Sequence, residues 1–437
     1  MKVEGGWSGL DTVALQTLGC KLNQAETESL ARKFLEAGYQ VIAPDHAADI
    51  YLLNTCTVTH IADRKSRNLL RLAYRRNPRA LIVATGCYAE RARDDLGSIE
   101  GVNLVVGNRD KERLVEIVGS MTNVPRRRSV QDGEQRLTFR TRALVKIQEG
   151  CSQPCSFCVV PRVRGRETSR SEEEIIAEVK AKVAEGYKEV VLTGTRIGSY
   201  GHDGGLMGLV CRILKETGIQ RLRLSSLEPK DLTPELLRLW GDSRLCPHIH
   251  LPLQSGSDSV LKRMGRTYTT AEYERAVSLA REAIPNLALT GDIMVGFPGE
   301  SEDEFGESYR FCERIGFAKL HVFPYSARPG TRASRMTGGV RDSDRSQRCQ
   351  LMLDLGRRSS RIFGERFLGQ NMNVLWEGCR EGVWFGLTEN YLRVFSCSHE
   401  QLANELLETK IVGQLDGSLW GELRTRCASL QGKGAIL

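Results

Sequence analysis

The sequence has no long apolar run and no recognisable leader. No stretch approaches the ~18 consecutive apolar residues that a membrane-spanning helix needs, and residues 1–11 lack the basic and then apolar segments of a secretory signal. These absences predict a cytoplasmic protein without a membrane partner. Aromatic residues are few, at 6%, whereas hydrophobic and charged residues make up 41% and 27%, as in an ordinary globular protein. The length of 437 residues predicts about two to four domains.

The most informative absence is that of a fourth cysteine beside Cys151, Cys155 and Cys158, which are spaced C-x3-C-x2-C. Structural zinc and an ordinary four-iron cluster each take four protein ligands. Three thiolates on one loop would leave one iron of such a cluster open to a ligand that is not protein. The alternatives are a zinc knuckle that borrows a distant ligand, or chance among 13 cysteines. A cytoplasmic chain with an odd number of cysteines is unlike a disulfide framework.

A second set of three cysteines accompanies strand–helix repeats in residues 12–120. Apolar runs predict strands at 12–18, 49–53, 81–85 and 102–106, with helices between them, and therefore a doubly wound parallel α/β domain. Cys20, Cys56 and Cys87 each follow one of the first three strands. Because parallel strands end at one edge, where ligands bind, these thiols should converge. The alternative is that small buried cysteines often occur at strand ends.

Residues 143–325 contain about six further strand–helix units, which predict an open, partial barrel. Ser171 and Glu174 form a capping-box pattern at the start of one of its helices. In such barrels the loops after the strands carry the chemistry. Four Gly- or Ser-containing loops occupy such positions: 193–198, 225–229, 254–256 and 296–299.

Positive charge is concentrated around the C-x3-C-x2-C loop. Residues 121–170 hold 11 Lys/Arg and 4 Asp/Glu, a net charge of +7, which suggests a polyanionic substrate such as nucleic acid. The arginines that follow the loop are Arg162, Arg164, Arg166 and Arg170. A second basic stripe, on the helix predicted after Cys56, consists of Arg64, Arg67, Arg71 and Arg75. A solvated linker and a solvated helix face are the alternatives.

The last segment changes to short alternating strands, predicted at 372–376, 383–388, 391–396, 409–414 and 418–423. They predict a small, OB-like all-β barrel, a type of module that often binds RNA. Trp384, Phe385 and Tyr391 are candidate stacking platforms or core residues. Residues 370–437 hold 6 Lys/Arg and 8 Asp/Glu, so charge does not favour RNA binding here.

Taken together, these motifs resemble the radical S-adenosylmethionine (SAM) methylthiotransferase family over nearly the whole chain. The resemblance rests on both cysteine sets and on the stretches Thr17–Gln24, Asn54–Thr59, Arg223–Pro229, His248–Gly256 and His321–Arg328. Within the family, it is greatest to the tRNA enzymes that act on N6-threonylcarbamoyladenosine. It implies an N-terminal methylthiotransferase domain (11–122), a basic linker (123–140), a radical-SAM partial (β/α)6 barrel (141–369) and a C-terminal TRAM domain (370–437).

The resemblance also implies two [4Fe–4S] clusters and SAM as cofactors. Cys151, Cys155 and Cys158 would hold the cluster that cleaves SAM, and Cys20, Cys56 and Cys87 would hold the cluster that presents sulfur. The residues expected to line the SAM pocket are Phe157, Gly194, Thr195, Ser226, Glu228 and Gln254. The expected partners are tRNA, an electron donor and a sulfur source.

The predicted function is therefore the methylthiolation of threonylcarbamoyladenosine beside the tRNA anticodon. One alternative is a sister enzyme that acts on isopentenyl-adenosine in tRNA or on a ribosomal protein. Another is an RNA-binding protein whose clusters are structural or redox-sensing, which the two three-cysteine sets oppose.

Overall fold

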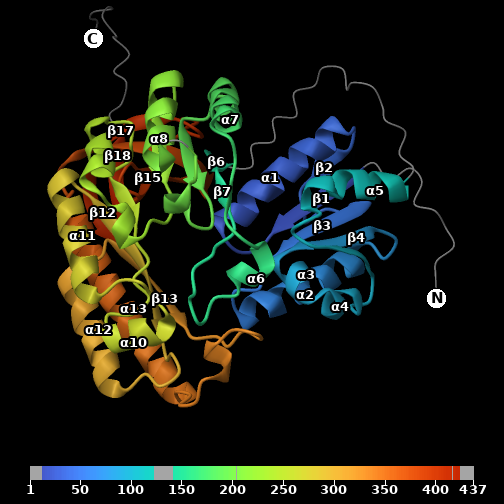
Figure 1. The fold of residues 1–437 in the computed structure, drawn as a ribbon. Helices are drawn as coiled ribbons and strands as arrows, with labels where there is room; N and C mark the ends of the chain where they lie inside the picture. The colour runs from blue at the N-terminus through green and yellow to red at the C-terminus, as the bar shows by residue number, and fades with distance from the viewer. Residues whose placement is uncertain (1–11, 123–140, 203, 416, 424–437) are drawn as a thin grey trace, which may run out of the picture.

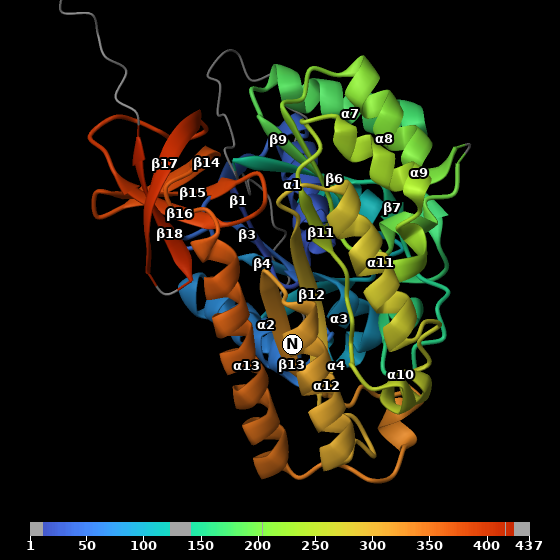
Figure 2. The same cartoon turned by 90° about the vertical axis from the view of Figure 1, so that its left-hand side faces the viewer.

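The computed structural model describes residues 12–122, 141–202, 204–415 and 417–423. These residues form an N-terminal α/β domain, a central partial barrel and a small C-terminal β-barrel (Figures 1 and 2). The mixed α/β class predicted from the sequence is confirmed. The predicted linker at 123–140 lies outside the described residues. No helix in the described part of the chain is long and apolar enough to cross a membrane.

The N-terminal domain is a five-stranded, fully parallel sheet with the strand order β2-β1-β3-β4-β5. Helices α1 and α5 cover one face, and α2, α3 and α4 cover the other (Figure 1). The elements are β1 (Thr12–Thr17), α1 (Lys21–Glu36), β2 (Gln40–Ile42), β3 (Ile50–Thr55), α2 (His60–Arg76), β4 (Leu81–Gly86), α3 (Cys87–Arg91), α4 (Arg93–Gly97), β5 (Val102–Val106) and α5 (Leu114–Thr122). In this strand order the chain reverses direction across the sheet between β1 and β3, and such switch points are where doubly wound sheets bind ligands.

The central domain contains two three-stranded parallel sheets, β6-β9-β10 and β11-β12-β13. Parallel bridges from Leu222 to Leu245 and from Ser226 to His250 join the two sheets into one curved wall. The strands are β6 (Arg142–Lys146), β9 (Glu189–Thr193), β10 (Arg221–Leu224), β11 (His248–His250), β12 (Ala288–Val295) and β13 (Lys319–Pro324). The six predicted strands are thus present, as an open barrel.

Helices cover the outside of this wall. They are α7 (Glu172–Ala184), α8 (Gly205–Glu216), α9 (Pro234–Leu237), α10 (Asp258–Met264), α11 (Thr270–Ala283), α12 (Glu302–Ile315) and α13 (Asp342–Glu365). The short helix α6 (Val160–Arg164) lies instead beside α3 of the N-terminal domain. Ser171 caps α7 by accepting a hydrogen bond from the backbone N–H of Glu174, as its sequence pattern predicts. Strand residues such as Leu289 and Ile293 pack on helix residues such as Phe311 and form the largest core of the molecule.

The C-terminal domain is a closed five-stranded barrel with the order β14-β15-β16-β18-β17. Its strands are β14 (Asn371–Arg380), β15 (Val383–Thr388), β16 (Arg393–Cys397), β17 (Leu406–Leu415) and β18 (Ser418–Leu423). The strand expected at 391–396 begins two residues late. Tyr391 has φ 70°, a left-handed conformation that a strand cannot contain, and it belongs instead to the turn after β15.

Candidate functional site

The three N-terminal thiols follow β1, β3 and β4, at the carboxyl edge of the sheet. Cys20 is the N-cap residue of α1, Cys56 follows β3 directly, and Cys87 is the first residue of α3. Gly19 has φ +100°, and a Cβ there would lie 2.8 Å from the Cβ of Cys56. Only glycine allows this turn and this close approach together. The Cys20 loop is therefore packed directly on Cys56.

These thiols also influence one another electrostatically. Burial raises the pKa of the Cys56 thiol to about 12, and the neighbouring Cys87 and Cys20 add to the increase. Cys56 and Cys87 are buried, whereas Cys20 is exposed. The domain thus presents two buried thiols and one accessible thiol at a single edge.

The C-x3-C-x2-C loop is held by backbone bonds to distant segments. The Cys151 N–H donates to the carbonyl of Gly165 (3.1 Å), and the Ser156 N–H donates to that of Met264 (2.8 Å). Burial, with the other two thiols nearby, raises the pKa of Cys158 to about 12. Arg266 donates to the Cys155 sulfur (3.3 Å), so a fixed cation faces this loop.

The donor chemistry of both sets fits an iron–sulfur cluster better than a single ion. Among the residues that the structure describes, no three His, Cys, Asp or Glu side chains are arranged to hold one metal ion. Sulfurs that bind different irons of a cluster lie farther apart than the ligands of one ion, and thiolates are the usual cluster ligands. Each set offers three thiols, which leaves room for one ligand that is not protein.

The two sets approach each other across the domain interface. Cys87 packs against Val159 and Val163, which follow Cys158, and Figure 1 shows α6 lying beside α3. The Asn108 amide donates to the carbonyl of Val163 (2.7 Å) and lies 3.8 Å from the Cys87 sulfur. A group held by one set would therefore lie close to a group held by the other.

Arg164 bridges the same interface. Its side chain is 2% exposed, and Nη1 lies 2.7 Å from both Glu26 Oε1 and Glu149 Oε1. Burial opposes ionisation of Glu26, but Lys111 and Arg164 together hold the pKa of its carboxyl well below the usual range. Arg164 and Arg170, two of the arginines that suggested a polyanionic substrate, are both engaged by carboxylates, with Arg170 bound to Glu178 (2.6 Å). Arg162 and Arg166 remain exposed.

A second buried arginine joins the loop after β13 to the N-terminal domain. The Arg328 side chain is 2% exposed and donates to Asp63 Oδ2 (3.0 Å), to the carbonyl of Thr57 (3.2 Å) and to His60 Nδ1 (3.2 Å). Asp63 also accepts from Arg91 (3.0 Å) and from the Thr57 hydroxyl (2.6 Å). Thr57 follows Cys56 directly, so this network fixes the Cys56 loop relative to the central domain.

The six residues predicted to line the SAM pocket surround the C-x3-C-x2-C loop only in part. Glu228 lies next to it: it accepts from Gln153 (3.2 Å) and pairs with Arg196 (3.0 Å) and Arg266 (3.3 Å). Phe157 packs on a separate apolar cluster formed by Val260, Met264, Phe297 and Ala333.

The other four lie after the central strands. The Thr195 hydroxyl is buried without a hydrogen-bond partner, as expected of a group that awaits a ligand. Gln254 has φ 71°, a strained conformation of the kind found at binding sites. Gly194 approaches the carbonyl of Gln148, 2.8 Å from where its Cβ would be, and Ser226 bridges to His250.

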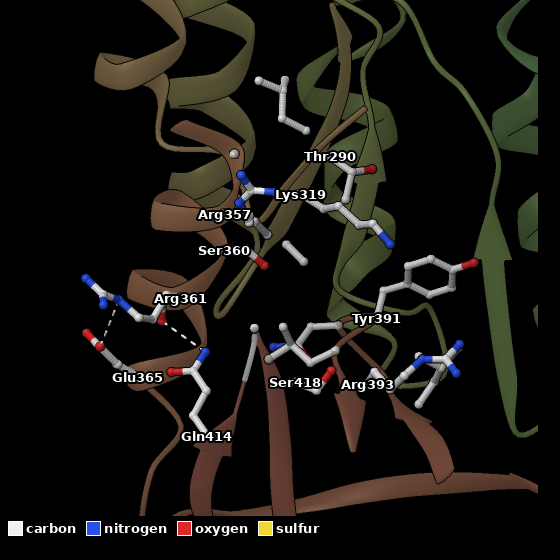
Figure 3. A pocket seen from close by; sticks show the side chains of 18 of the residues that line it. Thr290, Lys319, Arg357, Ser360, Arg361, Glu365, Tyr391, Arg393, Gln414 and Ser418 are labelled. Atoms are coloured by element: carbon white, nitrogen blue, oxygen red, sulfur yellow. Dashed lines mark hydrogen bonds and ion pairs between the residues drawn. The ribbon is translucent and has the colours of Figure 1, made fainter. Parts of the chain in front are cut away.

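A basic cleft lies where α13, β12 and β13 meet the C-terminal barrel, and we call it the basic cleft throughout (Figure 3). It encloses a cavity of about 940 Å³. Its cationic lining residues are Arg142, Lys319, Arg357, Arg358, Arg361 and Arg393, with Glu365 as the one acidic residue among those that line it. Such a cleft suits a phosphate backbone.

Tyr391 lies in the wall of the basic cleft rather than on a free surface. Its ring lies under the cations of Arg223 (4.7 Å), Arg142 (5.4 Å) and Lys21 (5.5 Å). Burial alone would raise the pKa of its phenol, but Lys21, Arg142 and Arg223 lower it to about 8. Trp384 belongs to the core of the C-terminal barrel. Phe385, like Tyr391, remains partly exposed.

Sequence reasoning missed the residues that join the domains and those inside the central barrel. Asp63, Asn108 and Arg266 carry no spacing signal, since their partners are distant in sequence. His250, Asp292 and His321 lie on three neighbouring strands, each at a position whose side chain faces inward. The two-residue period of a strand could have identified them from the sequence.

Two family models match the segments that carry the two thiol sets. Residues 145–312 match the radical SAM superfamily, and residues 12–107 match the Uncharacterized protein family UPF0004. Among solved structures, the chain is similar to the radical SAM methyltransferase TsrM from Kitasatospora setae, with a TM-score of 0.57 and 15% identity over 74% of this chain and 77% of that one. This likeness concerns the fold.

Curated relatives extend the match along the chain. The threonylcarbamoyladenosine tRNA methylthiotransferase MtaB of Bacillus subtilis is 37% identical, covering 92% of this chain and 94% of that protein. The MtaB of Aquifex aeolicus is 40% identical, covering 87% and 96%. The tRNA-2-methylthio-N(6)-dimethylallyladenosine synthase of Geobacter metallireducens is 34% identical, covering 95% and 99%.

Fold and site together define a radical SAM enzyme, in which a partial barrel carries a three-cysteine loop. The chain belongs to the radical SAM methylthiotransferase family. It is an enzyme of that class, and its cofactors are two [4Fe–4S] clusters and SAM.

Proposed function

We propose that this enzyme converts N6-threonylcarbamoyladenosine beside the tRNA anticodon to its 2-methylthio derivative. The observation that carries the proposal is the identity of 37–40% with MtaB enzymes over most of the chain. It is supported by the approach of the two thiol sets, because sulfur insertion needs a sulfur source and a radical source at one substrate atom.

The assignment of the cysteines is part of this proposal. Cys151, Cys155 and Cys158 hold one cluster, and Cys20, Cys56 and Cys87 hold the other. When bound, the first supplies the electron that cleaves the sulfonium of SAM, and the second holds the sulfur to be transferred. The chain's own part is to keep the two groups close together, which Arg164 and Arg328 do from buried positions.

We also assign Phe157, Gly194, Thr195, Ser226, Glu228 and Gln254 to the SAM pocket. The partnerless Thr195 hydroxyl offers a hydrogen bond to the nucleoside or amino acid part of the ligand. The pairing of Glu228 with Arg196 and Arg266 makes it a residue that orients two cations beside the C-x3-C-x2-C loop. The residues 11–122, 123–140, 141–369 and 370–437 are taken as the methylthiotransferase domain, linker, radical SAM domain and TRAM domain.

The basic cleft supports RNA as the macromolecular substrate. Its arginines come from a helix of the central domain and from the C-terminal barrel, so both domains would contact one backbone. The reaction further requires an electron donor and a sulfur source as partners. A cytoplasmic location follows from the proposed substrate.

A sister activity on dimethylallyladenosine is the second candidate, because relatives with that name are 34–35% identical over 94–95% of this chain. The discriminating experiment analyses tRNA nucleosides by mass spectrometry from cells with and without the gene. We expect loss of 2-methylthio-threonylcarbamoyladenosine alone. Loss of the methylthio-dimethylallyl nucleoside instead would assign the sister activity, and persistence of both in cells without a paralogue would refute the proposal.

A further inference from the structure

The inner face of the central barrel carries a ladder of polar side chains at the basic cleft. In the parallel register, His250 lies beside Thr290 and Thr290 beside Lys319; two residues further on, Asp292 lies beside His321. Cross-strand partners share a face. The alternate residues Leu289, Ile293 and Leu320 pack under the helices, so the polar ladder faces the interior.

Lys319 differs from most of the other cations of the cleft. Arg393 is likewise exposed and forms no ion pair within the described residues, but its guanidinium lies over the Phe385 ring (5.6 Å). Arg357 pairs with Asp354, Arg361 with Glu365 (3.6 Å), and Arg142 with Glu377 (2.8 Å). Lys319 is exposed and, within the described residues, its ammonium group forms no hydrogen bond or ion pair. Figure 3 shows its side chain beside Thr290 and Tyr391 at the cavity.

The Lys319 end of the cavity leads toward the N-terminal thiols. Strand geometry places His321 about 7 Å beyond Lys319 along β13. Lys21, which follows Cys20, lies over the ring of Tyr391 (5.5 Å), which itself lines the cavity. A ligand that reaches Lys319 with one end can therefore extend toward Cys20 with the other. The cavity of about 940 Å³ is large enough for a modified nucleoside.

We propose that Lys319 recognises the carboxylate of the threonylcarbamoyl group and so selects the substrate base. This inference rests on the proposed function. The threonylcarbamoyl group ends in a carboxylate and a hydroxyl, whereas a dimethylallyl group is apolar. The Lys319 ammonium group can form a charge-assisted hydrogen bond with the carboxylate of the first, and it gains no such bond from the second. The neighbouring Thr290 hydroxyl is already engaged by His248 Nε2 (3.1 Å) and His250 Nδ1 (3.0 Å).

The test compares two anticodon hairpins that differ only in carrying threonylcarbamoyladenosine or unmodified adenosine. Fluorescence anisotropy measures the affinity ratio between them for the wild-type holoenzyme and for K319M, K319R and, as a matched exposed lysine far from the cleft, K215A. We expect the wild-type ratio to be on the order of 10- to 100-fold, the value of a charge-assisted hydrogen bond. K319M should bring the ratio close to one, whereas K319R and K215A should retain most of it.

The outcomes separate this inference from the proposed function. If K319M keeps the wild-type ratio, or weakens both hairpins equally, Lys319 is not the recognition residue, even when the wild-type enzyme methylthiolates the modified hairpin. If the wild-type enzyme neither prefers nor methylthiolates the modified hairpin, the proposed substrate itself is wrong. Iron content and far-ultraviolet circular dichroism of K319M, expected to equal those of the wild type, show that the variant is folded.

Discussion

Replacing Arg328 with Met should loosen the contact between the N-terminal and central domains. The guanidinium is 2% exposed and donates to three acceptors. Removing one partner of a buried ion pair typically costs 3–5 kcal/mol because the other charge stays buried. Here Asp63 keeps its bonds to Arg91 and Thr57, so the cost should lie near the low end, at ~3 kcal/mol.

Native-state hydrogen exchange measures this effect directly. Amides of α2 that open when the domains separate should exchange on the order of 100-fold faster in R328M. The matched control is R314M, which removes an exposed pair with Glu274 whose side chains are 56% and 41% exposed; such pairs contribute at most ~1 kcal/mol. Equal exchange rates of α2 in R328M and R314M would refute the reasoning.

The R328M variant should also uncouple SAM cleavage from methylthiolation. Because the Arg328 network holds the Cys56 loop, R328M should form more 5′-deoxyadenosine per methylthiolated nucleoside than the wild type. R328K, which keeps the charge but not the forked geometry, should lie between them. An unchanged product ratio in R328M would mean that the network stabilises the fold without positioning the sulfur-donating site.

Three further predictions follow from single contacts. Anaerobically reconstituted enzyme should bind about eight irons and the C151A/C155A/C158A variant about four; unchanged iron in the variant would contradict the assignment of two clusters. Gly86→Ala should selectively lower the iron bound by the N-terminal set, because Gly86 has φ +96° and a Cβ there would lie 2.4 Å from Asn54 Oδ1, whereas the control Gly97→Ala, with open space around it, should not. In ultraviolet difference titration, one of the 11 tyrosines should ionise with a pKa of about 8, and this component of the titration should be absent from Y391F. Since this pKa lies below the unfolded value of about 10, ionisation of Tyr391 should add stability as pH rises through 8, and a titration without any component below pH 9 would contradict the geometry.

The strand–helix order was predictable because it depends on local apolar runs. Strands β4 and β5 lie within two residues of their predicted ends. The three-residue strand β2 escaped detection, since Gln40–Ile42 is too short to show a period. The turn at Tyr391 escaped detection because a left-handed φ at a tyrosine has no signal in the local sequence pattern.

The candidate site divides in the same way. Cysteine spacing and strand ends are local features, and they predicted the six thiols that we assign to the two clusters. The sequence could not show which arginines would be paired with carboxylates, because their partners are distant in the chain. Arg164 and Arg170 look like a collar for RNA in the sequence, but Glu26, Glu149 and Glu178, up to 138 residues away, occupy them.

In this chain of net charge +8, buried arginines form many of the contacts between the domains. Arginines of the central domain reach into both the N-terminal domain and the C-terminal barrel. Arg164 and Arg328 enter the N-terminal domain, and Arg221 and Arg223, with side chains 5% and 0% exposed, donate to carbonyls of the C-terminal barrel at Leu387 and Glu389. An arginine can satisfy several acceptors from one fixed plane, which a lysine cannot, so a few buried guanidinium groups fix both neighbouring domains. The cations that remain exposed and could meet a polyanion include Arg162 and Arg166 after the cysteine loop and Lys319 and Arg393 in the basic cleft.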